Sequence, residues 1–127
     1  MNVRFLVIFA LGAVGLATPA FSMDRWQALS MIESGNNDRA VGAVGEVSRF
    51  QIRPELWPGG NPQNPEVALS AAQKTMNPRL DRFKRLHKRQ PTDFEFYVLW
   101  NAPWGVDHPS AAVKERAGRY ANLVQQS

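Results

Sequence analysis

The segment Asp24–Gly35, DRWQALSMIESG, predicts a helix that ends beside a carboxylate. Asp24 followed three residues later by Gln27 is the pattern of a capped helix start, and Gly35 is a common residue at a helix end. Three apolar residues lead to Glu33 at helical spacing, namely Trp26, Leu29 and Ile32. Glu33 is therefore expected on or beside the buried stripe, where apolar neighbours disfavour its ionised form.

A second informative segment follows Glu33 at a distance of eighteen residues, where Gln51 lies within the stretch Phe50–Pro54, FQIRP. A carboxyl with a raised pKa, followed by a Gly-rich loop and a Gln-Ile segment, suits cleavage of a glycosidic bond. The reason is that the leaving oxygen must be protonated near neutral pH. The sequence therefore predicts Glu33 as a general acid.

Further helices are predicted downstream. Pro65 suits the first position of a long helix that reaches Leu86, with Pro78 either kinking this helix or starting another. The capping-box pattern Thr92–Glu95 opens an apolar helix that runs to Trp100. Pro103 and Gly105 end this helix. Pro109 is predicted to begin a last amphipathic helix. The pattern predicts a mainly α fold with four or five helices around one core.

Irregular structure is expected between these helices. The residues after Gly35, up to Gly45, are small and polar enough to form a loop. Val47 to Ile52 is compatible with a short strand, a turn of helix or part of a β-hairpin. The stretch from Leu56 to Pro65 is too rich in Pro and Gly for a regular element and is well placed to shape one wall of a cleft.

Residues 1–22 have the pattern of a signal peptide. A short basic start precedes an uninterrupted apolar run over residues 5–17, and small residues allow cleavage after Ser22 or after Ala20. The alternative is a membrane anchor, but thirteen apolar residues are few for a bilayer that needs about 20. We expect an exported chain, periplasmic or extracellular, without a stable membrane anchor after cleavage. Residues 23–127 are enough for one compact domain and too few for two.

Composition excludes several classes of function. The chain has no Cys, so its stability must come from packing, and its two His residues, His87 and His108, have no partners at metal-ligand spacing. The formal net charge is +4, or +3 without Arg4 of the leader, which suits an anionic envelope polymer. No nucleotide- or nucleic-acid-binding motif is present. We expect no metal, no cofactor, no nucleic-acid partner and a monomer.

Four short motifs follow one another along the mature chain: Glu33–Gly35 (ESG), Gly42–Gly45 (GAVG), Gln51–Pro54 (QIRP) and Trp100–Pro103 (WNAP). In order and rough spacing they resemble the motifs of the soluble lytic transglycosylase domain, within the lysozyme-like superfamily. The resemblance implies a largely helical lysozyme-like domain over residues 23–127. It also implies cleavage of the β-1,4 bond between N-acetylmuramic acid and N-acetylglucosamine in peptidoglycan.

The resemblance assigns roles residue by residue. Glu33 takes the place of the catalytic glutamate and Ser34 that of the small polar residue after it. Gln51 takes the place of the cleft glutamine, and Asn101 that of the asparagine in the family's Tyr-Asn-Ala-Gly motif. In this family the glutamate first protonates the glycosidic oxygen. It then withdraws a proton from the muramic acid 6-hydroxyl, which closes onto C1 and gives a 1,6-anhydro product.

The chain departs from the family pattern at three places. Trp100 replaces the usual Tyr, Pro103 replaces Gly, and Glu46–Arg49 replaces a short Leu-Met link before Gln51. The last departure adds an acid five residues before Gln51, a spacing similar to that of the second carboxylate in chicken-type lysozymes. Glu46 is therefore a candidate second carboxylate for a muramidase, which hydrolyses the same bond with water. Its alternative is a surface ion pair with Arg49.

Other residues are candidates for substrate contact. Tyr97 lies one helical turn before Asn101, and the Trp side chains at 57, 100 and 104 could bind sugar rings or fill the core. The basic run from Lys74 to Arg89 could attract anionic wall polymers or form a solvated helix face. A catalytically silent peptidoglycan-binding module is the alternative from another functional class.

Overall fold

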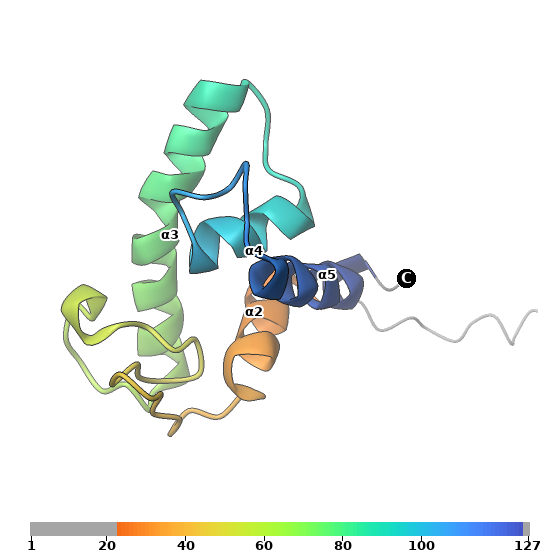
Figure 1. The fold of residues 1–127 in the computed structure, drawn as a ribbon. Coiled ribbons are helices and arrows are strands. Elements are labelled where there is room, and N and C mark those ends of the chain that lie inside the picture. Colours follow the sequence, from red (N-terminus) through yellow and green to blue (C-terminus); the bar gives the residue numbers. More distant parts are fainter. Residues whose placement is uncertain (1–22, 126–127) are drawn as a thin grey trace, which may run out of the picture.

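The computed structural model describes residues 23–125, and the predicted signal peptide lies outside them. The described chain is mainly helical and almost without strands, so the predicted mainly α fold is confirmed. The helices are α2 (Arg25–Ser34), α3 (Pro65–His87), α4 (Asp93–Asn101) and α5 (Ala111–Gln125), with a short 3-10 helix η1 (Pro54–Leu56) (Figure 1). None of the helices within residues 23–125 is long and apolar enough to span a bilayer.

Helix α2 begins and ends where the sequence predicts. The Asp24 carboxylate accepts hydrogen bonds from the backbone N–H groups of Trp26 and Gln27, both at 2.9 Å, and the Gln27 side chain accepts from the Asp24 N–H. This capping box satisfies donors that a helix start leaves unpaired. Gly35 ends the helix in the left-handed conformation, with φ of 66°, and so places Glu33 in the last turn.

Helix α3 is a single helix with Pro78 inside it. Of the two predicted alternatives for Pro78, a position within one helix or the start of a second, the first is therefore correct. Asn64 caps the helix start and Pro65 occupies the first helical position, where a missing N–H costs nothing. The helix ends at His87, and Lys88 follows in the left-handed conformation.

Helices α4 and α5 follow the sequence pattern with one correction. Thr92 and Glu95 form the predicted capping box of α4. The prediction that the last helix begins at Pro109 was two residues early, because α5 begins at Ala111. The physical reason is Ser110, whose hydroxyl oxygen accepts a hydrogen bond from the Val113 N–H at 3.2 Å. Ser110 therefore caps the helix, and the first helical residue comes after it.

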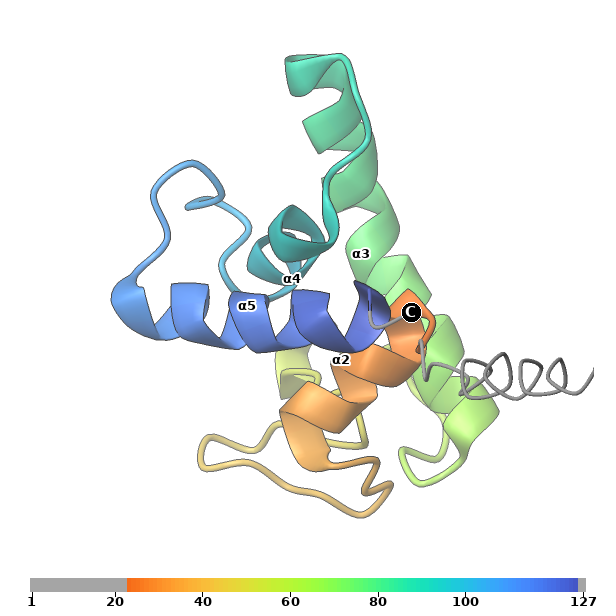
Figure 2. The same ribbon diagram turned by 90° about the vertical axis from the view of Figure 1, so that its right-hand side faces the viewer.

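The helices share a core in which α5 packs on both α2 and α4, and α4 packs on α3. Figures 1 and 2 show α3 along one side of the molecule, with its C-terminal end projecting past the other helices. Aromatic side chains join the elements: the ring of Phe96 stacks on that of Tyr120 at 5.8 Å, and Trp26 meets Phe96 edge-on at 5.5 Å. Aromatic pairs add stabilisation beyond their buried area.

The loop between α2 and η1 has no sheet. Two isolated antiparallel bridges, Val41 to Val47 and Val47 to Ile52, fold it back on itself. Of the three alternatives left open for Val47 to Ile52, the structure therefore has none as a regular element, only a turn closed by a single bridge. Phe50 and Ile52 are buried and hold this loop against the helical core. Figures 1 and 2 place the loop beside the N-terminal half of α3, at the same end of the molecule as the last turn of α2.

Candidate active site

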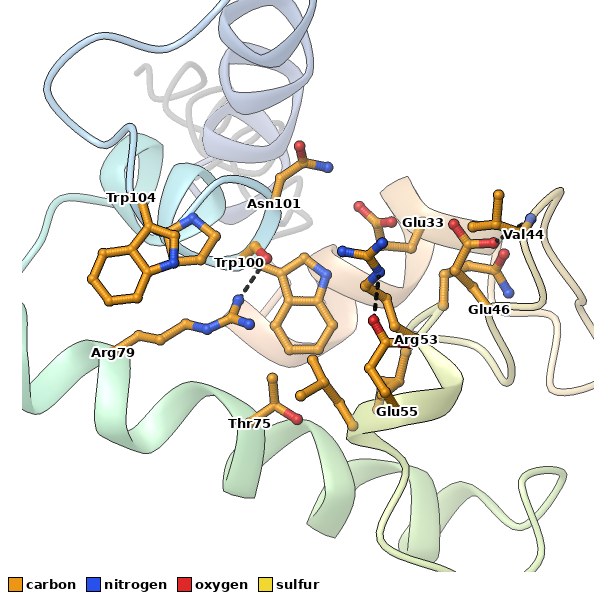
Figure 3. A pocket seen from close by; sticks show the side chains of 14 residues that line it. Glu33, Val44, Glu46, Arg53, Glu55, Thr75, Arg79, Trp100, Asn101 and Trp104 are labelled. Atoms are coloured by element: carbon orange, nitrogen blue, oxygen red, sulfur yellow. Dashed lines mark hydrogen bonds and ion pairs between the residues drawn. The ribbon is translucent and has the colours of Figure 1, made fainter.

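A cavity of about 580 Å³ opens between the last turn of α2, the loop that follows it, α3 and the end of α4 (Figure 3). Polar and apolar side chains both contribute to its wall, as in most ligand sites. The lining residues are Glu33, Val44, Glu46, Gln51, Ile52, Arg53, Glu55, Leu56, Thr75, Arg79, Trp100, Asn101, Pro103 and Trp104. Six candidates predicted from sequence therefore meet in one cavity, although they come from three separate stretches of the chain: Glu33, Glu46, Gln51, Trp100, Asn101 and Trp104.

Glu33 is held from behind by a buried tyrosine. The Tyr97 hydroxyl donates a hydrogen bond of 2.6 Å to Glu33 Oε2, and the side chain of Tyr97 is fully buried. Arg116 Nε in turn donates to the Tyr97 hydroxyl oxygen at 3.2 Å. The acid on α2 is thus fixed by a chain of side chains from α4 and α5.

Burial raises the pKa of Glu33 above the ordinary value for glutamate. The hydrogen bond from Tyr97 and the positive charge of Arg116 pull the pKa of Glu33 down, and the negative charge of Glu46 pushes it further up. Because burial outweighs the opposing contributions, the carboxyl holds its proton to a higher pH than an exposed glutamate. This is the protonation state that a general acid needs before it meets its substrate.

Glu46 lines the same cavity as Glu33 and supports the loop above it. Its Oε1 accepts a hydrogen bond from the Val44 N–H at 3.1 Å, and its backbone carbonyl accepts from the Gly42 N–H at 2.8 Å. The alternative of an ion pair between Glu46 and Arg49 is wrong, because Arg49 pairs with Asp38 at 2.7 Å. The Glu46 carboxylate thus remains beside Glu33 in the cavity.

Gln51 reaches the cavity from an unusual backbone conformation. Its φ is +52°, in the left-handed region, and its side-chain Nε2 donates to the Ser48 carbonyl at 2.9 Å. A non-Gly residue with positive φ costs free energy that the surroundings must offset, and such residues cluster at functional sites. Burial of the neighbouring Phe50 holds the turn in place.

Two residues at the end of α4, Trp100 and Asn101, form the wall opposite the loop (Figure 3). Arg79 of α3 donates to the backbone carbonyls of Leu99 and Trp100, at 3.0 and 2.7 Å. These are carbonyls that a helix end leaves without partners, so Arg79 fixes the position of Trp100. Burial lowers the pKa of Arg79.

Trp104 is 82 % exposed at the end of the cavity away from Glu46, and the guanidinium of Arg82 lies 4.3 Å from the centre of its ring (Figure 3). Two other predicted residues lie elsewhere among the described residues. Trp57 packs against the core, and its indole N–H donates to the Gly60 carbonyl. Ser34 donates to the Arg49 carbonyl at 2.7 Å and thereby braces the loop from outside the cavity.

Several residues of this site were missed by reasoning from sequence. Arg116 carried a signal, because it lies next to the apolar stripe of the last helix, where an Arg side chain needs a partner. Arg79 had no such signal in the sequence, because it is one of many basic residues in its helix. Glu55, which pairs with Arg53 at 3.2 Å in the cavity wall, was not singled out, and Arg53 was noted only as part of the Gln51–Pro54 motif, without a role of its own.

No protein-family model, no curated protein and no solved structure matches the chain. Within residues 23–125, no group of three or more His, Cys, Asp or Glu side chains could hold a metal ion.

A Gly42→Ala substitution tests the geometry of the loop above Glu33. A Cβ atom at this position would lie 2.2 Å from Glu46 Oε1 and 2.7 Å from Gln51 Oε1, so both side chains must move. Because both are the ends of flexible side chains, we expect a small loss of stability, about 1 kcal/mol. We expect a larger loss of kcat/KM on the substrate, roughly tenfold, because the cavity wall changes shape.

The matched control is Gly118→Ala on α5, where a Cβ atom meets nothing within 4 Å. A helical Ala is favoured over Gly, so this variant should gain about 0.5–1 kcal/mol and keep full activity. Thermal melts and initial rates of both variants give the comparison. Equal rates for Gly42→Ala and the wild type would contradict the role of this loop.

Proposed function

We propose that this chain is a peptidoglycan lytic transglycosylase of the lysozyme-like type, with Glu33 as acid and then base. The observation that carries the proposal is a carboxyl with a raised pKa in the wall of a cavity, hydrogen-bonded from behind by Tyr97. Its substrate is the β-1,4 bond between N-acetylmuramic acid and N-acetylglucosamine. The four motifs that resemble the soluble lytic transglycosylase domain support the same choice.

The reaction begins when Glu33 gives its proton to the oxygen that links the two sugars. The bond between this oxygen and C1 breaks, and positive charge develops at C1. The Glu33 carboxylate left behind is stabilised by the hydrogen bond from Tyr97 and by the charge of Arg116. Burial favours the return of a proton, so the same carboxylate is a competent base for the next step.

In the second step Glu33 withdraws the proton of the muramic acid 6-hydroxyl, whose oxygen bonds to C1. The product carries a 1,6-anhydro ring, no water is consumed, and Glu33 ends the cycle protonated. The exposed Trp104 offers a ring face, the largely buried Trp100 backs the cavity wall, and Asn101 and Gln51 offer amides for holding the sugars. No cofactor takes part in these steps.

A second candidate function is hydrolysis of the same bond, as in a muramidase. The observation that favours it is Glu46, which lines the cavity and whose charge raises the pKa of Glu33. A second carboxylate could act as a nucleophile at about 5 Å from the acid, or as a base for water at roughly 6.5–9.5 Å. We favour the transglycosylase because more of the four sequence motifs resemble that branch of the superfamily.

The remaining parts of the proposal concern location and partners. The pattern of residues 1–22 supports export to the periplasm or the cell exterior, where peptidoglycan is the partner. The net positive charge suits an anionic wall. We propose that the mature chain acts as a monomer.

Digestion of purified sacculi separates an enzyme from a binding module. The mature chain is incubated with sacculi, and the soluble glycan and the protein that sediments with the sacculi are both measured. The proposal expects soluble glycan to increase with time. Protein that sediments with sacculi of several wall types and releases no glycan would identify a catalytically silent binding module.

A further inference from the structure

Three side chains from three helices form a directed hydrogen-bond chain behind the cavity. Arg116 of α5 donates through Nε to the Tyr97 hydroxyl oxygen at 3.2 Å, and Tyr97 of α4 donates to Glu33 Oε2 at 2.6 Å. Helix α5 contributes no residue to the cavity lining within the described chain, so Arg116 acts on Glu33 from the protein side.

The chemistry of the three groups fixes the direction of the chain. A guanidinium only donates hydrogen bonds, so the Tyr97 oxygen must be the acceptor toward Arg116. The phenol carries a single hydrogen, and burial together with the charge of Glu33 raises the pKa of Tyr97, which keeps this hydrogen on the oxygen. With Arg116 on one side, the hydrogen is directed at Glu33 Oε2.

We infer that Arg116 is a positioning residue that directs the Tyr97 hydroxyl hydrogen toward Glu33 Oε2 and so keeps the acidic proton of Glu33 on Oε1. In a protonated carboxyl the carbonyl oxygen accepts hydrogen bonds better than the hydroxyl oxygen, so the hydrogen bond from Tyr97 at Oε2 favours the tautomer with the proton on Oε1. Oε1 has no such donor in this chain of contacts and is the oxygen that delivers the proton. The inference rests on the proposed function, in which that proton passes to the glycosidic oxygen.

Other charged groups also bear on Glu33 and must be kept constant in any test. Tyr97 on α4, Arg116 on α5 and Glu46 in the loop after α2 act on its pKa. The other charged residues in the cavity wall are Arg53 and Glu55 at η1 and Arg79 on α3. Without Arg116 the Tyr97 hydroxyl can rotate, and the Glu33 proton then distributes between its two oxygens. A fraction of the enzyme would carry the proton on the wrong oxygen.

The test combines rates with a spectroscopic signal that does not require cleavage. For Arg116→Gln we expect kcat to fall about tenfold with KM unchanged, and Arg116→Lys to recover most of it. In proton NMR the Tyr97 hydroxyl of the wild type should give a slowly exchanging downfield resonance, assigned by its loss in Tyr97→Phe. This resonance should weaken or vanish in Arg116→Gln and persist in Arg116→Lys.

A double-mutant comparison separates positioning from a plain effect of charge. In a Tyr97→Phe background, Arg116→Gln should cost little further kcat, because the group it positions is gone. Arg119→Gln on the same helix, whose partner Glu115 is exposed, is the control and should leave rates and spectrum unchanged. An unchanged hydroxyl resonance in Arg116→Gln, or an equal rate loss in both backgrounds, would overturn the inference.

The two readouts also separate this inference from the proposed function. If the wild type cuts no glycan, the hydroxyl resonance and its response to Arg116→Gln still report the direction of the chain. If the wild type cuts glycan but the hydroxyl resonance is the same in Arg116→Gln, the proposed function stands and the positioning role of Arg116 is wrong.

Discussion

Glu33→Gln is expected to lower the rate of glycan cleavage about a thousandfold, while the fold stays intact. The amide keeps the shape of the side chain and an oxygen that can accept from Tyr97, but it has no proton to give. Positioned general acids and bases contribute factors of roughly 10²–10⁴, and in the proposed mechanism Glu33 serves in both roles. Release of soluble glycan from sacculi, measured as an initial rate, gives the comparison.

The same variant should be more stable than the wild type at neutral pH. Burial raises the pKa of Glu33 in the folded state, so the folded state favours the protonated form. This preference stabilises the fold below the unfolded pKa of glutamate and is lost as pH rises through the folded pKa. Above the folded pKa the charge is a net cost, which Gln removes. Thermal melts should show that Glu33→Gln is more stable than the wild type at neutral pH and not at acidic pH.

Glu115→Gln is the matched control for both measurements. Glu115 is exposed on α5 and pairs with the equally exposed Arg119 across one turn of helix, so its loss should change neither rate nor stability by much. A Glu33→Gln protein that cleaves glycan at the rate of the control would remove Glu33 from the mechanism.

Leu29→Ala is expected to cause the largest loss of stability, about 3 kcal/mol. Leu29 is fully buried in the core one turn before Glu33, so its truncation leaves a cavity beneath the helix that carries the acid. For a domain of this size the melting temperature should fall by roughly 15 °C. Chemical denaturation at neutral pH measures the free energy of unfolding directly.

Leu86→Ala is the control for this substitution, because it removes the same atoms from a side chain that is 64 % exposed. The expected change is within about 0.5 kcal/mol. If the two variants lose equal stability, the placement of α2 in the core is wrong.

Sequence alone predicted much of the helical framework, because the signals at helix ends are local. Asp24 with Gln27 and Thr92 with Glu95 each satisfy unpaired donors within three residues, and Pro65 removes one such donor at the first helical position, so the printed sequence suffices to find these helix starts. The start of α5 was missed by two residues. There, Ser110 caps the helix and Pro109 does not.

The candidate site was predicted in part for a related reason. Glu33, Gln51 and Asn101 stand in short motifs, and all three line the cavity. The contacts that set their chemistry come from other helices and join residues far apart in the chain. The hydrogen bond of Tyr97 to Glu33 spans 64 residues, and no local pattern encodes it.

Side-chain burial decided two further cases. Trp57 and Trp104 both lie in turns rich in Pro and Gly, so the sequence treats them alike as candidates for a cleft. In the fold Trp57 packs against the core, and Trp104 is exposed at the cavity edge against Arg82. Only the path of the chain through space separates a core tryptophan from an exposed one.

The most direct measurement of the central claim is mass spectrometry of the glycan ends released from sacculi by the mature chain. The account predicts new ends lighter by one water than reducing ends, because the muramic acid 6-hydroxyl replaces water at C1. These ends should be absent after digestion with Glu33→Gln. Reducing ends that depend on Glu33 would contradict the transglycosylase and make the chain a hydrolase, with Glu46 as its second carboxylate.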